Sequence, residues 1–257
     1  PTRGGPSYVL NIDGQNLLFD CGRCAVHNIS RFDIPVETIS EVYITHLHFD
    51  HICDLPLLLL LSWNNGRTKR MPVYGPKGIE SFLENGLRHA YVDDIKSRLS
   101  HGKSPDYLEW DTIELIKEGV CREAETHTID TLITKHGGLL NFSYRITTPD
   151  KKIVITSDSE PDTRLIDFCR DADLVLIECS GTKEFYATQA WGGWHMTPED
   201  IGKIVSEAGA KKVVLKHLVI ESFSKDPNIS ESMAEVIRSL HPNGEIIVGE
   251  DGMKFTV

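Results

Sequence analysis

Residues 45–51, Thr-His-Leu-His-Phe-Asp-His, are the feature that most restricts what this chain can fold into. His46 and His48 are two positions apart, so both imidazoles point to the same side if the extended backbone of the preceding apolar stretch continues. Asp50 and His51 follow, where the chain should turn into a leucine-rich helix. Imidazoles and a carboxylate converging at a strand end suit a divalent transition metal such as zinc. The alternative is a set of surface histidines.

Composition limits the size and the partners of the molecule. The chain has 257 residues, 40% of them hydrophobic, with no low-complexity tract, linker or short-period repeat. A chain of this size suits one large domain or two small ones, and we expect a single domain over residues 1–257. The formal net charge of −11 disfavours broad binding to phosphate backbones, and no run of Lys and Arg offsets it.

Cysteine usage and hydropathy bear on the compartment. Six cysteines in a chain of this length are too sparse for a disulfide scaffold, which favours a reducing, cytoplasmic setting. The longest apolar run, residues 55–61, contains Pro56 and is too short to cross a bilayer. The first ten residues lack the pattern of a signal peptide, so no membrane partner is expected.

Periodicity predicts many short strands with helices between them, which indicates an α/β protein with sheets inside and helices outside. The expected strands are residues 7–12, 15–19, 40–44, 112–116, 125–135, 142–147, 152–156, 174–177, 212–216, 245–248 and 254–257. The expected helices are residues 51–63, 77–86, 89–99, 198–207 and 230–240. The Asp13-Gly14 pair between the first two strands predicts a hairpin.

Three further residues stand at the ends of strand-like runs. Asp158 and His217 each follow an apolar run, where a sheet delivers ligands to one edge. His136 follows the run 125–135 and precedes two glycines, so an ordinary turn histidine is the alternative there.

At this point the sequence resembles the metallo-β-lactamase superfamily. Residues 45–51 resemble its HxHxDH signature, and residues 17–22 (LLFDCG) resemble the strand before it. His136, Asp158 and His217 match the superfamily's later ligands in the right order, and the resemblance spans about residues 7–255. It implies a four-layer αβ/βα metallo-β-lactamase sandwich with two divalent metal ions.

The matched residues divide into two ligand groups. One ion is expected on His46, His48 and His136, and the second on Asp50, His51 and His217. Asp158 would bridge them, leaving room for a bridging hydroxide that is a nucleophile at neutral pH. Zinc is the expected metal, with manganese or iron as alternatives.

A second motif is similar to the tRNase Z and phosphodiesterase branch of the superfamily. Trp194-His195-Met196-Thr197 precedes the helix 198–207 and resembles that branch's extra histidine motif. The resemblance implies that His195 stabilises developing charge or protonates the leaving group, and that Asp50 orients the hydroxide or accepts its proton. A helix N-terminal histidine held by packing is the alternative for His195.

One departure concerns tRNA. Enzymes of the tRNase Z type carry a long arm, rich in glycine and basic residues, and no such arm is visible between Glu109 and His136 or elsewhere. Together with the charge of −11, this predicts a small-molecule substrate and no tRNA partner. The resemblance to this branch leaves open whether the chain forms a homo- or hetero-oligomer.

The sequence therefore predicts a dinuclear metal-dependent hydrolase that attacks a phosphodiester. One alternative is a hydrolase of a small-molecule ester, lactone or aryl ether with the same metals, and another is a non-catalytic metal-binding module. Residues 191–194 are either a pocket wall or core, and residues 90–110 either a cap or a plain surface helix. Cys21 and Cys24 have a redox or zinc spacing but lack a second such pair.

Overall fold

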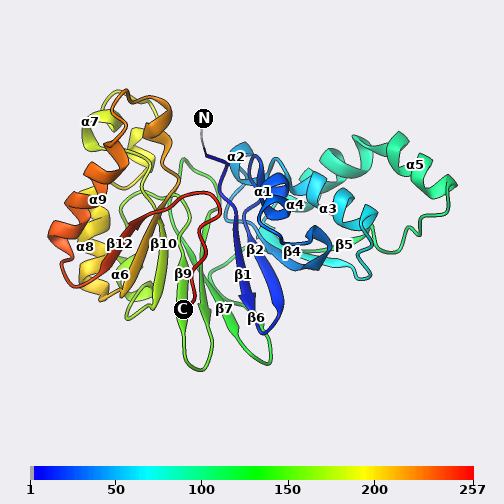
Figure 1. Cartoon of the computed structure of the whole chain (residues 1–257), viewed down its shortest axis with the longest axis horizontal. Coiled ribbons are helices and arrows are strands. Elements are labelled where there is room, and N and C mark those ends of the chain that lie inside the picture. The colour runs from blue at the N-terminus through cyan, green and yellow to red at the C-terminus, as the bar shows by residue number, and fades with distance from the viewer. Residues whose placement is uncertain (1–2) are drawn as a thin grey trace. The chain divides into compact units, whose positions relative to one another are not determined.

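The computed structural model describes residues 3–257, which form two compact units. The N-terminal unit comprises residues 4–116, and the C-terminal unit comprises Arg3 and residues 117–257. Each unit contains one β-sheet with helices packed against it (Figure 1). None of the helices in residues 3–257 is long and apolar enough to cross a membrane.

The N-terminal unit is built on a five-stranded sheet in the order β1-β2-β3-β4-β5. The hairpin of the first two strands is confirmed, with positive φ angles of 48° at Asp13 and 82° at Gly14 in its turn. The strands from β2 to β5 run parallel, so their carboxyl ends lie at one edge. The strands are β1 (Tyr8–Ile12), β2 (Gln15–Phe19), β3 (Ile39–Tyr43), β4 (Met71–Pro76) and β5 (Trp110–Leu115).

Several helices of this unit depart from the predicted ranges, and α1 and η1 were not predicted. The expected helix 51–63 is divided into α2 and α3, and the expected helix 77–86 is shorter and continues as a π-helical turn, η2. Buried side chains such as Leu18, Val42 and Trp63 form the core between sheet and helices. The helices are α1 (Ala25–Arg31), η1 (Val36–Thr38), α2 (Phe49–Ile52), α3 (Leu55–Asn64), α4 (Ile79–Leu83), η2 (Glu84–His89) and α5 (Val92–Ser100).

The C-terminal unit is built on a seven-stranded sheet in the order β12-β11-β10-β9-β8-β7-β6. Strands β9 to β12 are parallel, and β6 to β9 are antiparallel. The predicted strand at residues 254–257 is wrong, because that segment pairs with no neighbouring strand. The strands are β6 (Gly119–Glu123), β7 (Thr128–Ile133), β8 (Phe142–Thr147), β9 (Lys152–Ile155), β10 (Leu174–Glu178), β11 (Lys212–Lys216) and β12 (Glu245–Val248).

Two long helices, α8 and α9, pack side by side along this sheet (Figure 1). Helix α8 begins with a capping box, in which Thr197 and Asp200 satisfy each other's backbone N–H groups, and it ends at Gly209 with a φ of 67°. The helices are α6 (Arg164–Phe168), α7 (Lys183–Tyr186), η3 (Gly192–Trp194), α8 (Pro198–Ala208), η4 (Val219–Ser222) and α9 (Ile229–Leu240).

The Glu221 carboxylate ties together three segments of the C-terminal unit. It accepts hydrogen bonds from Arg3 at 2.6 Å and 3.0 Å and from the Ser230 hydroxyl at 2.6 Å. Burial by itself raises the pKa of Glu221, but these donors hold it below the ordinary value of 4.5.

Replacing Glu221 with glutamine is expected to lower Tm by about 2–4 °C at pH 7, since a partly exposed pair contributes about 1 kcal/mol. A carboxyl whose folded-state pKa is lowered stabilises the fold above its unfolded pKa and loses that effect as pH falls through the folded value. The difference in Tm between wild type and Glu221→Gln should therefore shrink below about pH 5. Thermal unfolding at several pH values checks this, and a constant difference down to pH 3.5 would contradict it.

Candidate metal centre and catalytic residues

The predicted ligands are divided between the two units. The N-terminal unit carries His46, His48, Asp50 and His51, and the C-terminal unit carries His136, Asp158 and His217. In each unit they lie just beyond the carboxyl ends of strands, at one edge of the sheet.

In the N-terminal unit, a buried carboxylate at the end of β2 orients the histidine motif. Asp20 accepts hydrogen bonds from the Thr45 backbone N–H at 2.8 Å and from the Thr45 hydroxyl at 3.0 Å. It also lies 2.9 Å from Nδ1 of His51, and all three side chains are fully buried. This bond places the His51 proton on Nδ1 and leaves the Nε2 lone pair available to a cation.

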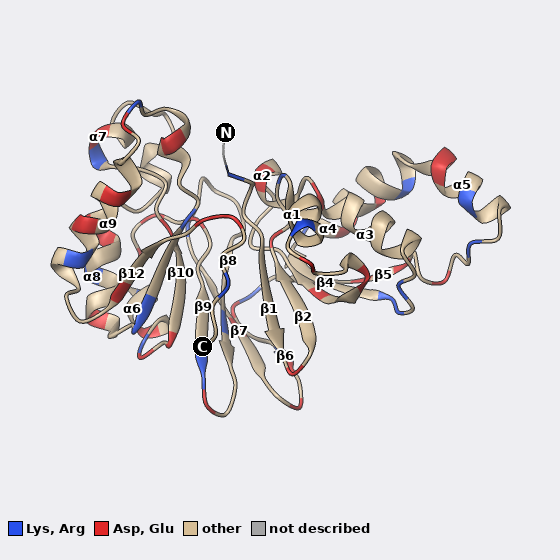
Figure 2. Ribbon diagram, viewed as in Figure 1, with Lys and Arg blue, Asp and Glu red and all other residues tan. Residues whose placement is uncertain are grey.

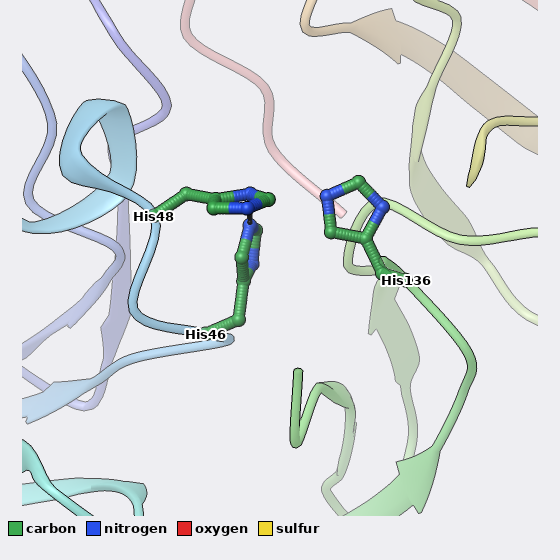
Figure 3. Close-up of side chains that lie close together, drawn as sticks. All are labelled: His46, His48 and His136. Atoms are coloured by element: carbon green, nitrogen blue, oxygen red, sulfur yellow. Dashed lines mark hydrogen bonds between the residues drawn. The ribbon is translucent and has the colours of Figure 1, made fainter. Parts of the chain in front are cut away.

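The first two histidines of the motif converge on each other. Figure 3 shows their rings pointing toward one another from the segment between β3 and α2, and it also labels His136, which follows β7. Nε2 of His46 lies 2.9 Å from Nδ1 of His48, and the Thr45 hydroxyl lies 3.0 Å from Nδ1 of His46. Two ring nitrogens this close are suited to sharing one cation.

A close backbone contact explains the glycine of the DCG turn. A Cβ atom at Gly22 would lie only 2.0 Å from the backbone oxygen of Asp50, so any side chain there would displace the motif. The Asp50 side chain itself is one-third exposed, and its Oδ2 lies 3.9 Å from Nε2 of His51. Gly22 therefore allows the end of the motif, at Asp50, to pack against the turn that follows β2.

In the C-terminal unit, parallel strands bring acidic and imidazole side chains to one edge. Asp158 follows β9, and His217 follows β11 with a φ of 56°. Their side chains approach to 3.3 Å, between Oδ2 of Asp158 and Nε2 of His217. The buried Lys216 ammonium lies 3.8 Å from the other oxygen of Asp158. Asp158 thus lies between an imidazole and a cation.

The sequence reasoning missed Glu178, the last residue of β10. Its buried carboxylate lies 2.8 Å from Nδ1 of His195 and accepts from the Ser180 hydroxyl and the Ser159 backbone N–H, each at 2.9 Å. The Ser180 hydroxyl also lies 2.7 Å from Nδ1 of His217. Glu178 could share a metal ion with Asp158 and His195, but its oxygens are already occupied by these donors. We therefore assign it to the orientation of His195.

The charge state of this pair follows from its partners. Complete burial by itself raises the pKa of Glu178, but the charge and hydrogen bond of His195 hold it below its ordinary value. The Glu178 carboxylate is therefore ionised at neutral pH, and it stabilises the protonated form of His195. The alternative of a helix histidine held only by packing does not account for this contact.

His136 is also oriented by a backbone group. Its Nδ1 lies 3.0 Å from the Trp194 carbonyl oxygen, so Nδ1 carries the proton and Nε2 keeps a lone pair. Burial lowers the pKa of His136, and the nearby Asp158 charge opposes that shift only in part. A neutral imidazole is the form that binds metal ions.

The donor set fits divalent transition metals. It combines neutral imidazoles with carboxylates, and the hydrogen bonds at Nδ1 of His51 and His136 orient both rings. The signal that would have found Glu178 and Asp20 is the one that found Asp158, namely an acidic residue at the end of an apolar strand. Asp20 and Glu178 stand in this position at the ends of β2 and β10.

The cysteines and the segment at residues 90–110 make the following contacts. All six cysteines are free, and burial raises the pKa of Cys21 well above its ordinary value, so its thiol is not poised as a redox or zinc thiolate. The loop after α5 is tied to the end of α3, because Lys103 donates to the Asn64 carbonyl at 2.7 Å and Trp63 donates to the Ser104 carbonyl at 2.8 Å. In Figure 2, α5 contains both acidic and basic residues.

Comparison with known proteins places this geometry in a family. The family model described as Anti-Pycsar protein Apyc1 matches residues 6–225. Ribonuclease Z of Geobacillus kaustophilus is 30% identical over 281 residues, covering 93% of this chain and 89% of that protein. The chain belongs to the tRNase Z-like branch of the metallo-β-lactamase superfamily, in the Anti-Pycsar protein Apyc1 family.

Solved structures confirm the predicted fold class of this superfamily member. The metallo-β-lactamase fold protein YhfI of Bacillus subtilis aligns with a TM-score of 0.74 and 22% identity, covering 97% of this chain and 90% of its own. Human tRNase Z, short form, aligns with a TM-score of 0.74 and 21% identity, covering 98% and 92%. With the ribonuclease Z relatives, the prediction of a metal-dependent hydrolase is confirmed, and the non-catalytic alternative is set aside.

The prediction that tRNA is excluded as a partner is wrong. Ribonuclease Z relatives match 93% of the chain, and a tRNase Z shares its fold, although this chain has no recognisable arm. The physical error lies in using net charge, because the charge of a whole chain does not determine the field at one site. Figure 2 shows acidic and basic residues interspersed along both units.

Asp20 provides a test of the metal assignment that does not depend on a substrate. Asp20→Asn keeps the shape of the side chain but removes the charge that supports His51. We expect metal affinity to fall by about 10–100-fold, the usual effect of losing such a supporting carboxylate. Competition with a coloured chelator measures this, and unchanged affinity would remove His51 from the ligand set.

Proposed function

We propose that this chain is a dinuclear metal-dependent phosphodiesterase. The site would hold two divalent ions, with zinc as the expected metal. The proposed ligands are His46, His48, Asp50, His51, His136, Asp158 and His217. Ions held there would provide positive charge for the phosphoryl oxygens and a water of lowered pKa as nucleophile. The superfamily performs many reactions, so the choice of phosphodiester depends on the residues of this chain.

The observation that carries the proposal is the Glu178–His195 pair. His195 donates Nδ1–H to the carboxylate, at 2.8 Å, so the proton that the protonated ring would give to a leaving group is the one on Nε2. As water adds to phosphorus and the ester P–O bond breaks, the departing alkoxide takes the Nε2 proton. The proton lost by the water restores the pair for the next turnover. Such a step suits the poor alcohol leaving groups of natural phosphodiesters.

The immediate surroundings of Asp158 also favour phosphate. Lys216 lies 3.8 Å from Asp158, and the Ser180 hydroxyl joins Glu178 to His217. A cation and a hydroxyl group near the proposed ligands complement an anionic substrate, whereas a neutral ester would gain nothing from the additional positive charge. The proposed role of Asp50 is to orient the attacking water or accept its proton.

A second candidate, hydrolysis of a small-molecule ester, lactone or aryl ether, has one observation in its favour. The ring of Trp191 lies edge-on to His195 with 5.2 Å between centroids, and Tyr186 stacks on it at 5.9 Å. Aromatic rings around the proposed acid would suit an apolar substrate as well as a nucleotide.

The first experiment measures metal content and turnover together. Zinc-loaded and metal-free protein would be assayed with bis(p-nitrophenyl) phosphate, p-nitrophenyl acetate and a precursor tRNA. We expect two ions per chain and metal-dependent cleavage of the phosphate diester, and tRNA cleavage would define the substrate further. Ester cleavage without phosphodiester cleavage, with two ions bound, would replace the proposal by the second candidate. One ion per fully active chain would overturn the dinuclear site.

A further inference from the structure

Trp194 has a different environment from the other aromatic residues near His195. It ends the short helix η3 and immediately precedes His195. Its carbonyl oxygen accepts from Nδ1 of His136 at 3.0 Å, and its ring lies edge-on to the His136 ring with 6.1 Å between centroids. Trp194 therefore lies against both a proposed ligand and the proposed acid.

The indole ring rests on the backbone of Gly137. A Cβ atom there would lie 2.8 Å from Cε3 and 2.9 Å from Cζ3 of Trp194, closer than real Cβ contacts allow. Gly137 also has a φ of 55°, which an L side chain rarely adopts. The absence of a side chain at residue 137 thus lets the ring approach the backbone on one side.

The ring is nevertheless far from buried. Trp194 is 38% exposed, whereas Tyr186, which stacks on His195, is buried and Trp191 is partly buried. Trp191 and Tyr186 hold His195 in place through ring contacts. The exposed surface of Trp194 does not help to hold His195. Because the other side of the indole ring already packs on backbone, Trp194 would lose little further conformational entropy when a planar ligand covers the exposed surface.

We propose that Trp194 stacks on a planar ring of the substrate, a nucleobase or an aryl group attached to the phosphodiester. This inference rests on the proposed function. The His136 ring lies 4.9 Å from the His195 ring and 6.1 Å from the Trp194 ring between centroids, so a phosphate ester whose leaving oxygen takes the His195 proton would bring its substituents near Trp194. Stacking between a base and an aromatic side chain tolerates any base, so it would select for planarity rather than for one sequence.

The test compares two substrates with the same leaving group. Thymidine 5′-(p-nitrophenyl phosphate) carries a nucleobase, and ethyl p-nitrophenyl phosphate does not. Zinc-loaded Trp194→Leu keeps apolar bulk without a ring, and Trp194→Tyr keeps a ring. Phe223→Ala is the matched control, because Phe223 is 63% exposed in the same unit and contacts Phe185 at 5.5 Å between ring centroids.

We expect Trp194→Leu to raise KM for the thymidine ester about tenfold with kcat within twofold, and Trp194→Tyr to stay within about threefold of wild type. A KM effect confined to the thymidine ester would identify the base as the stacked ring, and an equal effect on both would identify the aryl group. Equal losses in the Leu and Tyr variants, or none in Leu, would overturn the inference. If wild type cleaves neither ester, the proposed function itself has failed.

Discussion

Asp158→Ala is expected to reduce turnover of bis(p-nitrophenyl) phosphate by about 10³-fold or more. Asp158 is the one proposed ligand to both ions, and its oxygens lie 3.3 Å from His217 and 3.8 Å from Lys216. Removing it leaves the buried Lys216 without this carboxylate and weakens both ions' sites. Lost transition-state charge stabilisation of several kcal/mol corresponds to a loss of that size.

The measurement is kcat together with zinc per chain, by metal analysis of the folded variant. Asp158→Asn keeps the shape of the side chain and separates loss of charge from loss of packing. Asp167→Ala is the matched control, because Asp167 is an exposed aspartate of the same unit that pairs only with Arg170 among the described contacts. Full activity in Asp158→Ala with two ions bound would remove Asp158 from the proposed mechanism.

His195→Ala is expected to lower kcat by about 10²–10⁴-fold on a substrate with an alcohol leaving group, the usual range for a lost general acid. Glu178→Gln should lower it by at least about tenfold, because a neutral amide no longer stabilises the protonated imidazole that donates at 2.8 Å. Neither variant should lose zinc, since neither residue is a proposed ligand.

Leaving-group dependence distinguishes an acid from a merely structural histidine. Nitrophenolate departs without protonation, so His195→Ala should lose far less activity on bis(p-nitrophenyl) phosphate than on thymidylyl-thymidine, whose leaving group is an alcohol. Equal losses on both substrates would indicate that His195 supports the fold or the metals instead. Glu178→Asp, which keeps the charge, should recover part of the activity that Glu178→Gln loses.

The strands were predicted well where local pattern decides them. Residues 142–147, 212–216 and 245–248 are strands β8, β11 and β12 with the predicted bounds. Strand β4 was missed because it contains Pro72 and Pro76. Its pairing with β3 involves only Val73 and Tyr74, so the missing N–H groups of both prolines interrupt no bond on that side.

The strand predicted at residues 254–257 was wrong because its composition is typical of a strand but the segment does not pair with one. The segment has a strand-like composition, but it contacts its unit through a side chain, with the Lys212 ammonium 5.6 Å from the Phe255 ring. Neither sheet of the described residues includes this segment. Composition reports the preference of a segment, whereas a strand also requires a partner.

The sequence by itself determined the motif, the order of the proposed ligands and the superfamily, because these depend on residue types at short spacing and on strand ends. Only the tertiary structure showed that Glu178 holds His195 and that Asp20 holds His51. Each pair joins residues 17 or 31 positions apart, at the carboxyl edge of a sheet. The order of the strands in the sheet determines which distant side chains meet there, and that order cannot be predicted from local sequence pattern.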